Sequence, residues 1–426
     1  MKKTVFIFAV MMAVGFSMMA QLPTADKYRE AANRGDANAQ CNLGICYKNG
    51  WGVEPEVNQA IIWFTKSANQ GVAYAKECLG DIYASGRGVE KDPAKAAYWY
   101  KQAFEQDLAD ANRGDVKAQY EMGRHYENGH GVDKNMSKAM EWYSKAAEQG
   151  NEDAQSELAW NYFYGLEGVA KDTKKGLYWM EKCAEQGSPV FQEHLGEIYF
   201  NGQDVAKDYS KAVNWLSKAA TYQRYPNSEP VLKAKYYLGS CYYIGGYGIT
   251  KDLNRAVYLY RQSAEAGFAA AQYMLGVCYY YGDGVEENDS QAAYWFRKSA
   301  DQDIVQAMEM LGHCYRTGAG VEKDFSKAFA LYKKAAEKGL IDSQYELGRC
   351  YEYGKGVATD MTQAAYWYQK ASEQGHAAAQ YHLGFCYGRG EGVPMDENKA
   401  IYWLKQSAAN GNEDAQANLK EWGISW

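Results

Sequence analysis

The sequence predicts an all-α solenoid, because one short unit with helical spacing recurs along nearly the whole chain of 426 residues. The line Leu-Gly-x-Cys-Tyr, or a close variant, appears ten times at steps of 36 or 37 residues, with two steps of 43. Its first position, slot 0, is occupied by Leu43, Leu79, Met122, Leu158, Leu195, Leu238, Leu275, Leu311, Leu347 and Leu383. Such a unit cannot bury a core alone, so about ten helix pairs must stack into one body.

Each unit reads as two helices joined by a glycine-rich turn. In residues 342–375, small and apolar residues follow helical spacing up to Tyr351, and the run 354–357 ends that helix. Asp360 begins the second helix, and Gly375 supplies a left-handed cap. The helix-start position is Asp or Asn in nine of the ten units. It holds Glu56, Asp92, Asn135, Asp172, Asp208, Asp252, Asn288, Asp324, Asp360 and Asp396.

Uniform slots indicate where the helices pack. Slot +1 is glycine in nine units, which lets two helices approach closely, and slot +4 is always tyrosine. Six of the nine cysteines occupy slot +3, at Cys46, Cys241, Cys278, Cys314, Cys350 and Cys386. Equivalent positions in stacked helices lie too far apart for a disulfide, so we expect buried thiols there. A bridge that involves Cys41 or Cys78 stays open.

The ends and two insertions break the repeat. Residues 25–34 have the pattern of a lone second helix and residues 413–422 that of a lone first helix, so half units close the array. A seven-residue insertion after Asp107 has no helix breaker and is expected to lengthen a second helix by two turns. The other insertion, at 225–230, contains two prolines and is expected to protrude as a loop, either for contact or as a plain excursion.

The N-terminus has the pattern of a secretory signal peptide. Lys2 and Lys3 precede an almost wholly apolar stretch, residues 5–19, and Ala20 offers a small residue for cleavage before Gln21. We therefore expect a signal peptide at 1–20, a single solenoid at 21–426, and export to the periplasm or the medium. No later segment is long and apolar enough to span a bilayer.

Charge and motifs argue against several function classes. The formal net charge is -7 with no basic run, which argues against nucleic acid as the main partner. Motifs of zinc proteases, phosphate loops, dinucleotide sites and serine hydrolases are absent from the sequence. The six histidines have no metal-ligand spacing with cysteine or carboxylate. We expect no enzyme, no metal and no cofactor.

The pattern Ala-x-x-x-Leu-Gly-x-x-Tyr, then Gly-x-Gly-Val, then Asp-x-x-x-Ala-x-x-Trp-Tyr resembles the Sel1-like repeat, a relative of the tetratricopeptide repeat. Residues 377–411 carry nearly every element, and the resemblance covers about residues 22–422. It implies a right-handed superhelix of antiparallel helix pairs that scaffolds or binds proteins. Cysteine-rich secreted members are linked to penicillin binding and weak β-lactamase activity, but they carry a cysteine pair in each repeat, unlike this chain.

Variation among the units locates a free surface. On a helical wheel, the uniform slots share one side and the variable slots -2, +2 and +5 share the other. In a tetratricopeptide-like superhelix this first-helix face lines the concave surface. Aromatic residues and arginines, which favour interfaces, gather there. The candidate contact residues are Tyr120, Arg124, Trp160, Phe163, Phe200, Tyr236, Tyr243, Tyr273, Tyr280, His313, Tyr345, Arg349, Tyr381 and Phe385.

The sequence therefore predicts an exported, monomeric scaffold or adaptor that binds a protein or peptide on its concave face. Arg124 and Arg349 would bind carboxylates. Two alternatives stay open: partial burial of the same residues between repeats, and binding of cell-wall glycan or peptide fragments with weak β-lactamase-like activity. A second tyrosine stripe, expected to pack between second helices, comprises Tyr98, Tyr178, Tyr258, Tyr294, Tyr366 and Tyr402.

Overall fold

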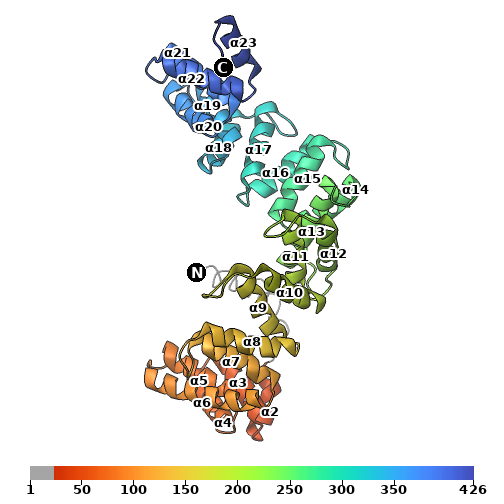
Figure 1. Cartoon of the computed structure of the whole chain (residues 1–426), viewed down its shortest axis with the longest axis vertical. Coiled ribbons are helices and arrows are strands. Elements are labelled where there is room, and N and C mark those ends of the chain that lie inside the picture. The colour runs from red at the N-terminus through yellow and green to blue at the C-terminus, as the bar shows by residue number, and fades with distance from the viewer. Residues whose placement is uncertain (1–23) are drawn as a thin grey trace. The chain divides into compact units, whose positions relative to one another are not determined.

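The computed structural model describes residues 24–426, which form helices and contain no named strand (Figure 1). These 22 helices belong to two compact units, one formed by 24–198 with 202–206 and the other by 199–201 with 207–426. The predicted signal peptide lies outside the described residues. Whether 21–426 forms a single body stays a prediction.

The first unit contains α2 (Ala25–Asn33), α3 (Ala37–Asn49), α4 (Val57–Ala68), α5 (Ala73–Ser85), α6 (Pro93–Asn112), α7 (Val116–Asn128), α8 (Met136–Glu148), α9 (Glu152–Tyr164) and α10 (Thr173–Glu185). Helix α11 (Pro189–Asn201) is divided between the units.

The second unit contains α12 (Tyr209–Ala220), α13 (Glu229–Ile244), α14 (Leu253–Glu265), α15 (Ala269–Tyr281), α16 (Asp289–Ala300), α17 (Val305–Thr317), α18 (Phe325–Glu337), α19 (Ile341–Tyr353), α20 (Met361–Glu373), α21 (Ala377–Arg389), α22 (Glu397–Ala409) and α23 (Glu413–Glu421).

From α2 to α10 in the first unit and from α12 to α23 in the second, each helix packs against the next one in the chain. Odd-numbered helices from α3 to α21 carry slot 0 and are the first helices, and even-numbered helices from α4 to α22 are their partners. The lone helix α2 packs on α3, and the lone helix α23 packs on α22. The predicted all-α solenoid of helix pairs with half-unit ends is thus confirmed. No helix within residues 24–426 is long and apolar enough to cross a membrane.

The predicted helix starts are confirmed. Nine second helices begin after an Asp or Asn whose side-chain oxygen accepts a hydrogen bond from the backbone N–H three residues on; in α14, for example, Asp252 accepts from Arg255 at 2.9 Å. Glu56, the exception, makes no such bond at the start of α4. Its longer side chain is a poorer cap than Asp or Asn.

The slot +1 glycines touch an aromatic or apolar side chain of the second helix. A Cβ on Gly276 of α15 would lie 2.7 Å from ring carbons of Phe296 on α16, which is fully buried. The sequence indicated a close approach here but not its partner, which stands one residue after the tryptophan of the second-helix pattern, Trp295 in this repeat. In the one unit with alanine at slot +1, Ala159, the matching second-helix position holds Met180 instead of a ring. The glycine at slot +1 and the aromatic ring of the second helix therefore occur together, because the ring fills the space that a side chain on the glycine would occupy.

The two insertions have different outcomes. Helix α6 continues unbroken through the first insertion over 20 residues, as predicted. The loop predicted at 225–230 is wrong at its end, because α13 begins at Glu229 and Pro230 lies in its first turn. Proline is tolerated there because the first N–H groups of a helix have no intrahelical acceptor. The loop itself covers residues 221–228.

All nine cysteines are buried and free. This confirms the prediction for the six in slot +3, and no bridge involves Cys41 or Cys78. Burial raises the pKa of the Cys314 thiol to about 11 and that of Cys278 to about 12. Such thiols stay protonated near neutral pH and are poor nucleophiles. They serve as small packing residues.

Candidate binding surface

Thirteen of the fourteen predicted contact residues are partly buried. In the first unit these are Tyr120, Arg124 and Trp160, and in the second Phe200, Tyr236, Tyr243, Tyr273, Tyr280, His313, Tyr345, Arg349, Tyr381 and Phe385. The fourteenth, Phe163, is fully buried, so its interpretation as a contact residue is wrong. Helix α10 carries Gly176 where other second helices carry alanine, and a Cβ there would lie 2.7 Å from the Phe163 Cα. This close approach of α10 encloses Phe163.

The slot -2 tyrosines pack against the buried rings of the second helices. In the second unit the ring centroids of Tyr273 and Phe296 are 6.0 Å apart, and those of Tyr345 and Tyr368 are also 6.0 Å apart. In the first unit Tyr120 lies 5.6 Å from the buried Tyr143. One side of each ring is therefore packed against the second helix of its own repeat, and part of the residue remains accessible. The partial-burial alternative had expected this packing between neighbouring repeats.

Further contacts between neighbouring repeats hold this face in place. The Tyr243 hydroxyl donates to Asp283 Oδ2 at 2.6 Å, and the Tyr280 hydroxyl lies 3.2 Å from His313 Nε2. Each bond joins residues of two consecutive repeats within the second unit. Side chains that are already ordered lose less conformational entropy when they bind a partner.

Arg124 is neutralised inside the first unit. Its guanidinium lies 2.7 Å from Glu121 and 3.4 Å from Glu77, which is buried on α5. Burial opposes the ionised form of Glu77, but the His130 ring, whose Nδ1 lies 3.6 Å from Glu77 Oε1, and the charge of Arg124 hold its pKa below the ordinary value. Arg124 therefore has two carboxylates already, which weakens its predicted role as a carboxylate anchor.

Sequence reasoning missed a buried polar pair next to this cluster. His125 Nε2 lies 2.9 Å from Asp107 Oδ2, and His125 Nδ1 lies 3.0 Å from the His130 carbonyl oxygen. Asp107 lies on α6 directly before the insertion that lengthens this helix, and His125 stands in slot +3, where six other repeats have cysteine. A histidine in slot +3, where eight of the ten repeats have cysteine or isoleucine, was the available signal.

In the second unit, Glu309 occupies slot -2, where several other repeats have tyrosine. Burial, followed by the charges of Asp342 and Glu346 on α19, raises the pKa of Glu309 to about 7. The face thus carries a carboxyl group that titrates near neutral pH beside the tyrosine rings.

Comparison with known proteins accounts for this architecture. The sequence model of the Sel1 repeat family matches ten segments of the chain, which are residues 37–72, 79–108, 116–151, 152–188, 189–221, 232–268, 269–304, 305–340, 341–376 and 377–412. The chain belongs to the Sel1 repeat family. Proteins built from such repeats are generally non-catalytic scaffolds for protein interaction. No curated protein matches the chain.

Two solved structures share the family and cover most of this chain. A protective antigen of uropathogenic Escherichia coli strains, with the same repeat fold, is 31% identical, with a TM-score of 0.59. The alignment covers 95% of this chain and 91% of the antigen. A Sel1 repeat protein from Oxalobacter formigenes is 33% identical over 74% of this chain and 89% of its own, with a TM-score of 0.61.

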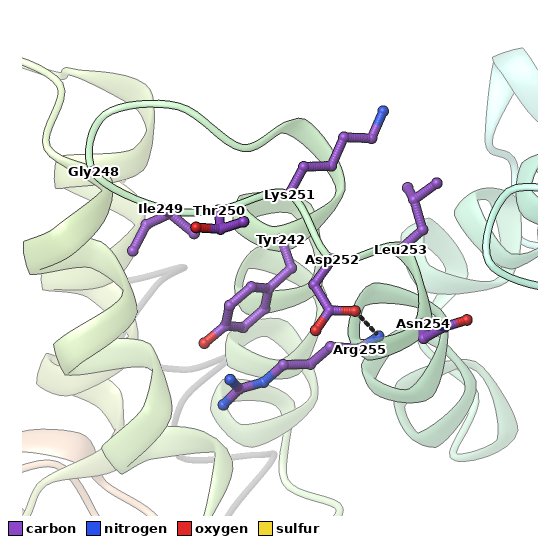
Figure 2. Close-up of a pocket in the computed structure, with 9 residues that line it drawn as sticks. All are labelled: Tyr242, Gly248, Ile249, Thr250, Lys251, Asp252, Leu253, Asn254 and Arg255. Carbon is purple, nitrogen blue, oxygen red and sulfur yellow. Dashed lines mark hydrogen bonds between the residues drawn. The ribbon is translucent and has the colours of Figure 1, made fainter.

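A wide surface hollow of about 730 Å³ lies at the start of α14 (Figure 2). Figure 2 shows the Arg255 side chain beneath the Tyr242 ring, and its guanidinium carbon lies 4.2 Å from the ring centroid. The same contact recurs elsewhere, for instance between Lys327 and Tyr315 at 5.2 Å. A cation three residues after the capping residue covers the slot +4 tyrosine, so this hollow follows from the Sel1 fold.

The second tyrosine stripe does not pack between helices as expected. Its six members are between 46% and 62% exposed. In five of the six, the ring instead meets the edge of the tryptophan next in sequence, as Tyr98 meets Trp99 at 5.1 Å. A lysine four residues on lies over three of these rings, for instance Lys298 over Tyr294 at 5.8 Å. These contacts come from the same helix, and they leave about half of each ring exposed.

One group within residues 24–426 has ligand atoms close enough for a metal ion. Atoms of Glu193, His194 and Glu197 on α11 all lie within 4.8 Å of one another. His194 Nε2 already shares a hydrogen bond of 2.7 Å with the Tyr164 hydroxyl. A structural zinc site has four ligands in a tetrahedron, and three residues of one helical turn with an engaged histidine do not supply it. We assign no metal here.

The raised pKa of Glu309 predicts a pH dependence of stability. Its ordinary pKa is 4.5, so the contribution of protonated Glu309 is fully present below that pH and is lost as pH rises through about 7. Glu309→Gln should therefore raise the urea midpoint at about pH 8 and leave it unchanged at about pH 4. Urea titrations of both proteins at the two pH values test this. An equal difference at both would show that Glu309 acts through packing.

Proposed function

We propose that this Sel1 repeat protein is an exported, monomeric scaffold that binds a protein or peptide on the first-helix face of its repeats. We expect that face to be concave. The observation that carries the proposal is the contrast between slots in the second unit. The uniform slots 0, +1 and +3 are buried there, whereas most residues in slots -2, +2 and +5 are aromatic or charged and partly accessible.

The slot -2 residues of α13, α15, α19 and α21 make up the aromatic part of this surface. They are Tyr236, Tyr273, Tyr345 and Tyr381. Tyrosine supplies a large contact area with a polar end and few rotatable bonds. Because each ring already packs against the protein on one side, binding a partner would cost little further side-chain conformational entropy.

Replacing Tyr236, Tyr273 and Tyr345 together by alanine should reduce partner recovery at least about tenfold, because interface energy concentrates in few aromatic anchors. The measurement is crosslinking of the tagged protein in its native host, followed by mass spectrometry of the adducts. The same spectra determine the N-terminus, which we expect at Gln21. Circular dichroism must show unchanged helicity for the comparison to count.

The matched control replaces Tyr258, Tyr294 and Tyr366, three exposed members of the second-helix stripe, by alanine. This variant removes the same side chains from the opposite helices and should keep full partner recovery. Loss of the partner in the control but not in the first variant would place binding on the second helices and refute the proposal. Normal recovery in both would refute it as well.

A further inference from the structure

A small hollow between α17, α18 and α19 in the second unit gathers four cationic side chains. It is lined by Arg316 at the end of α17, Lys323 in the turn that follows, Arg349 on α19, and Lys355 after α19. Its volume is about 200 Å³, enough for one side chain of a partner. Phe325 supplies an apolar part of the wall.

The carboxylate of Glu346 lies within this hollow and indicates how the arginines there would contact a bound anion. Glu346 Oε1 is 3.3 Å from an Arg349 guanidinium nitrogen, and Glu346 Oε2 is 3.9 Å from Arg316 Nε. The two guanidinium groups thus stand on either side of a carboxylate. Arg316 also donates from Nε to the Tyr332 hydroxyl at 3.3 Å, and its Nη2 lies 3.1 Å from His313 Nδ1. Since a guanidinium has five N–H donors, both arginines still keep donors for a second carboxylate.

The two lysines are not neutralised. Their Nζ atoms lie 4.9 Å (Lys323) and 5.0 Å (Lys355) from the centroid of the Phe325 ring, so both ammonium groups converge on one aromatic wall. Neither forms an ion pair within 4.0 Å in residues 24–426. Four cations therefore face one carboxylate, in a protein whose net charge is -7.

The Sel1 fold does not require this charge. The hollow one repeat earlier is lined by the equivalent residues Tyr280, Glu287, Asp289, His313 and Ala319. These stand where the cationic hollow has Arg316, Lys323, Phe325, Arg349 and Lys355. The same architecture thus holds two acidic residues in one repeat and four basic residues in the next. Because the backbone tolerates both, the basic set is a property of this site.

We propose that this hollow binds an aspartate or glutamate side chain in an acidic segment of the peptide or protein partner. The proposal rests on the proposed function and names the chemistry of its ligand. Bidentate contacts from Arg316 and Arg349 would hold the carboxylate, the two lysines would add long-range attraction, and Phe325 would contact the methylene groups of the ligand.

Binding of a rhodamine-labelled peptide of six glutamates, followed by fluorescence anisotropy, tests the proposal. Saturable binding is expected that weakens as salt is raised, and an uncharged peptide of six glutamines should not bind. Arg349→Gln with Lys355→Gln should weaken binding at least about tenfold. Glu346→Gln should strengthen it several-fold, because it removes the internal competitor; a misfolded variant cannot give that result.

The control is Lys251→Gln with Arg255→Gln, which removes two positive charges from the hollow at the start of α14 in the same unit. It should leave affinity nearly unchanged. Equal losses in both double variants would mean attraction to general charge and would overturn the proposal. Displacement of the peptide by inorganic phosphate, at concentrations where acetate has no effect, would overturn the proposal in favour of a phosphate site. If partner recovery fails in the host while the glutamate peptide still binds, the proposed function fails and this site stands.

Discussion

Replacing Gly276 by alanine should lower the free energy of unfolding by about 2 kcal/mol, although alanine is the better helix former. The change gains about 1 kcal/mol of helix propensity, but overpacking of a filled core costs about 3 kcal/mol. The new methyl group would lie 2.7 Å from two carbons of the fully buried Phe296 ring. Since Phe296 belongs to a buried cluster with Ala307, Met308 and Leu311 of α17, its ring cannot move aside freely.

A double-mutant cycle with Phe296→Met provides the control. The repeat that naturally has alanine at slot +1, Ala159, has methionine at the matching position, Met180. Gly276→Ala should therefore cost little once Phe296 is methionine, because a flexible thioether side chain can make room. Urea unfolding measures the energies, and hydrogen exchange in α15 and α16 shows whether the loss is local. Equal costs in both backgrounds would contradict the steric explanation.

Replacing Asp107 by alanine should destabilise the first unit by about 3 kcal/mol, because it leaves a buried histidine without its partner. His125 is 2% exposed, and its Nε2 loses the 2.9 Å contact with Asp107. Burial is the main cause that raises the pKa of Asp107, while the bond with His125 lowers it, so the pair is needed to offset burial of the carboxyl group. Chemical denaturation of both proteins at neutral pH measures the difference.

The control adds His125→Cys to the Asp107→Ala variant. Slot +3 is cysteine in six other repeats, so the double variant returns this repeat to the common apolar packing and should regain part of the lost stability. Asp107→Asn, which keeps an acceptor oxygen, should cost less than Asp107→Ala. A double variant less stable than Asp107→Ala would show that His125 contributes through contacts other than this pair.

The repeat made much of the local structure predictable. Ten copies at nearly constant steps identify slots, and each slot has a physical requirement that its residue type reveals. Asp252 is a helix cap because its short carboxylate reaches the backbone, and Leu275 is core because it is apolar at slot 0. The unbroken α6 was predictable for the same reason, since the insertion contains no helix breaker.

The candidate surface was predictable only in outline. Variation among copies indicated which side of each first helix is free, and thirteen of the fourteen residues on it are partly accessible. Phe163 was misjudged because its burial depends on Gly176, in another helix. The tyrosine stripe on the second helices was misjudged because whether another helix covers a ring is a tertiary property.

The sequence by itself determined the fold class, the helix boundaries near their capping residues, and the side of each helix that packs. These follow from periodicity and from interactions within a few residues. Only the tertiary structure decided which residues of different helices meet: Asp107 with His125, Gly276 with Phe296, and four cations around one hollow. These contacts depend on how closely two helices approach and how far each side chain reaches, and no periodic pattern in the sequence encodes those distances.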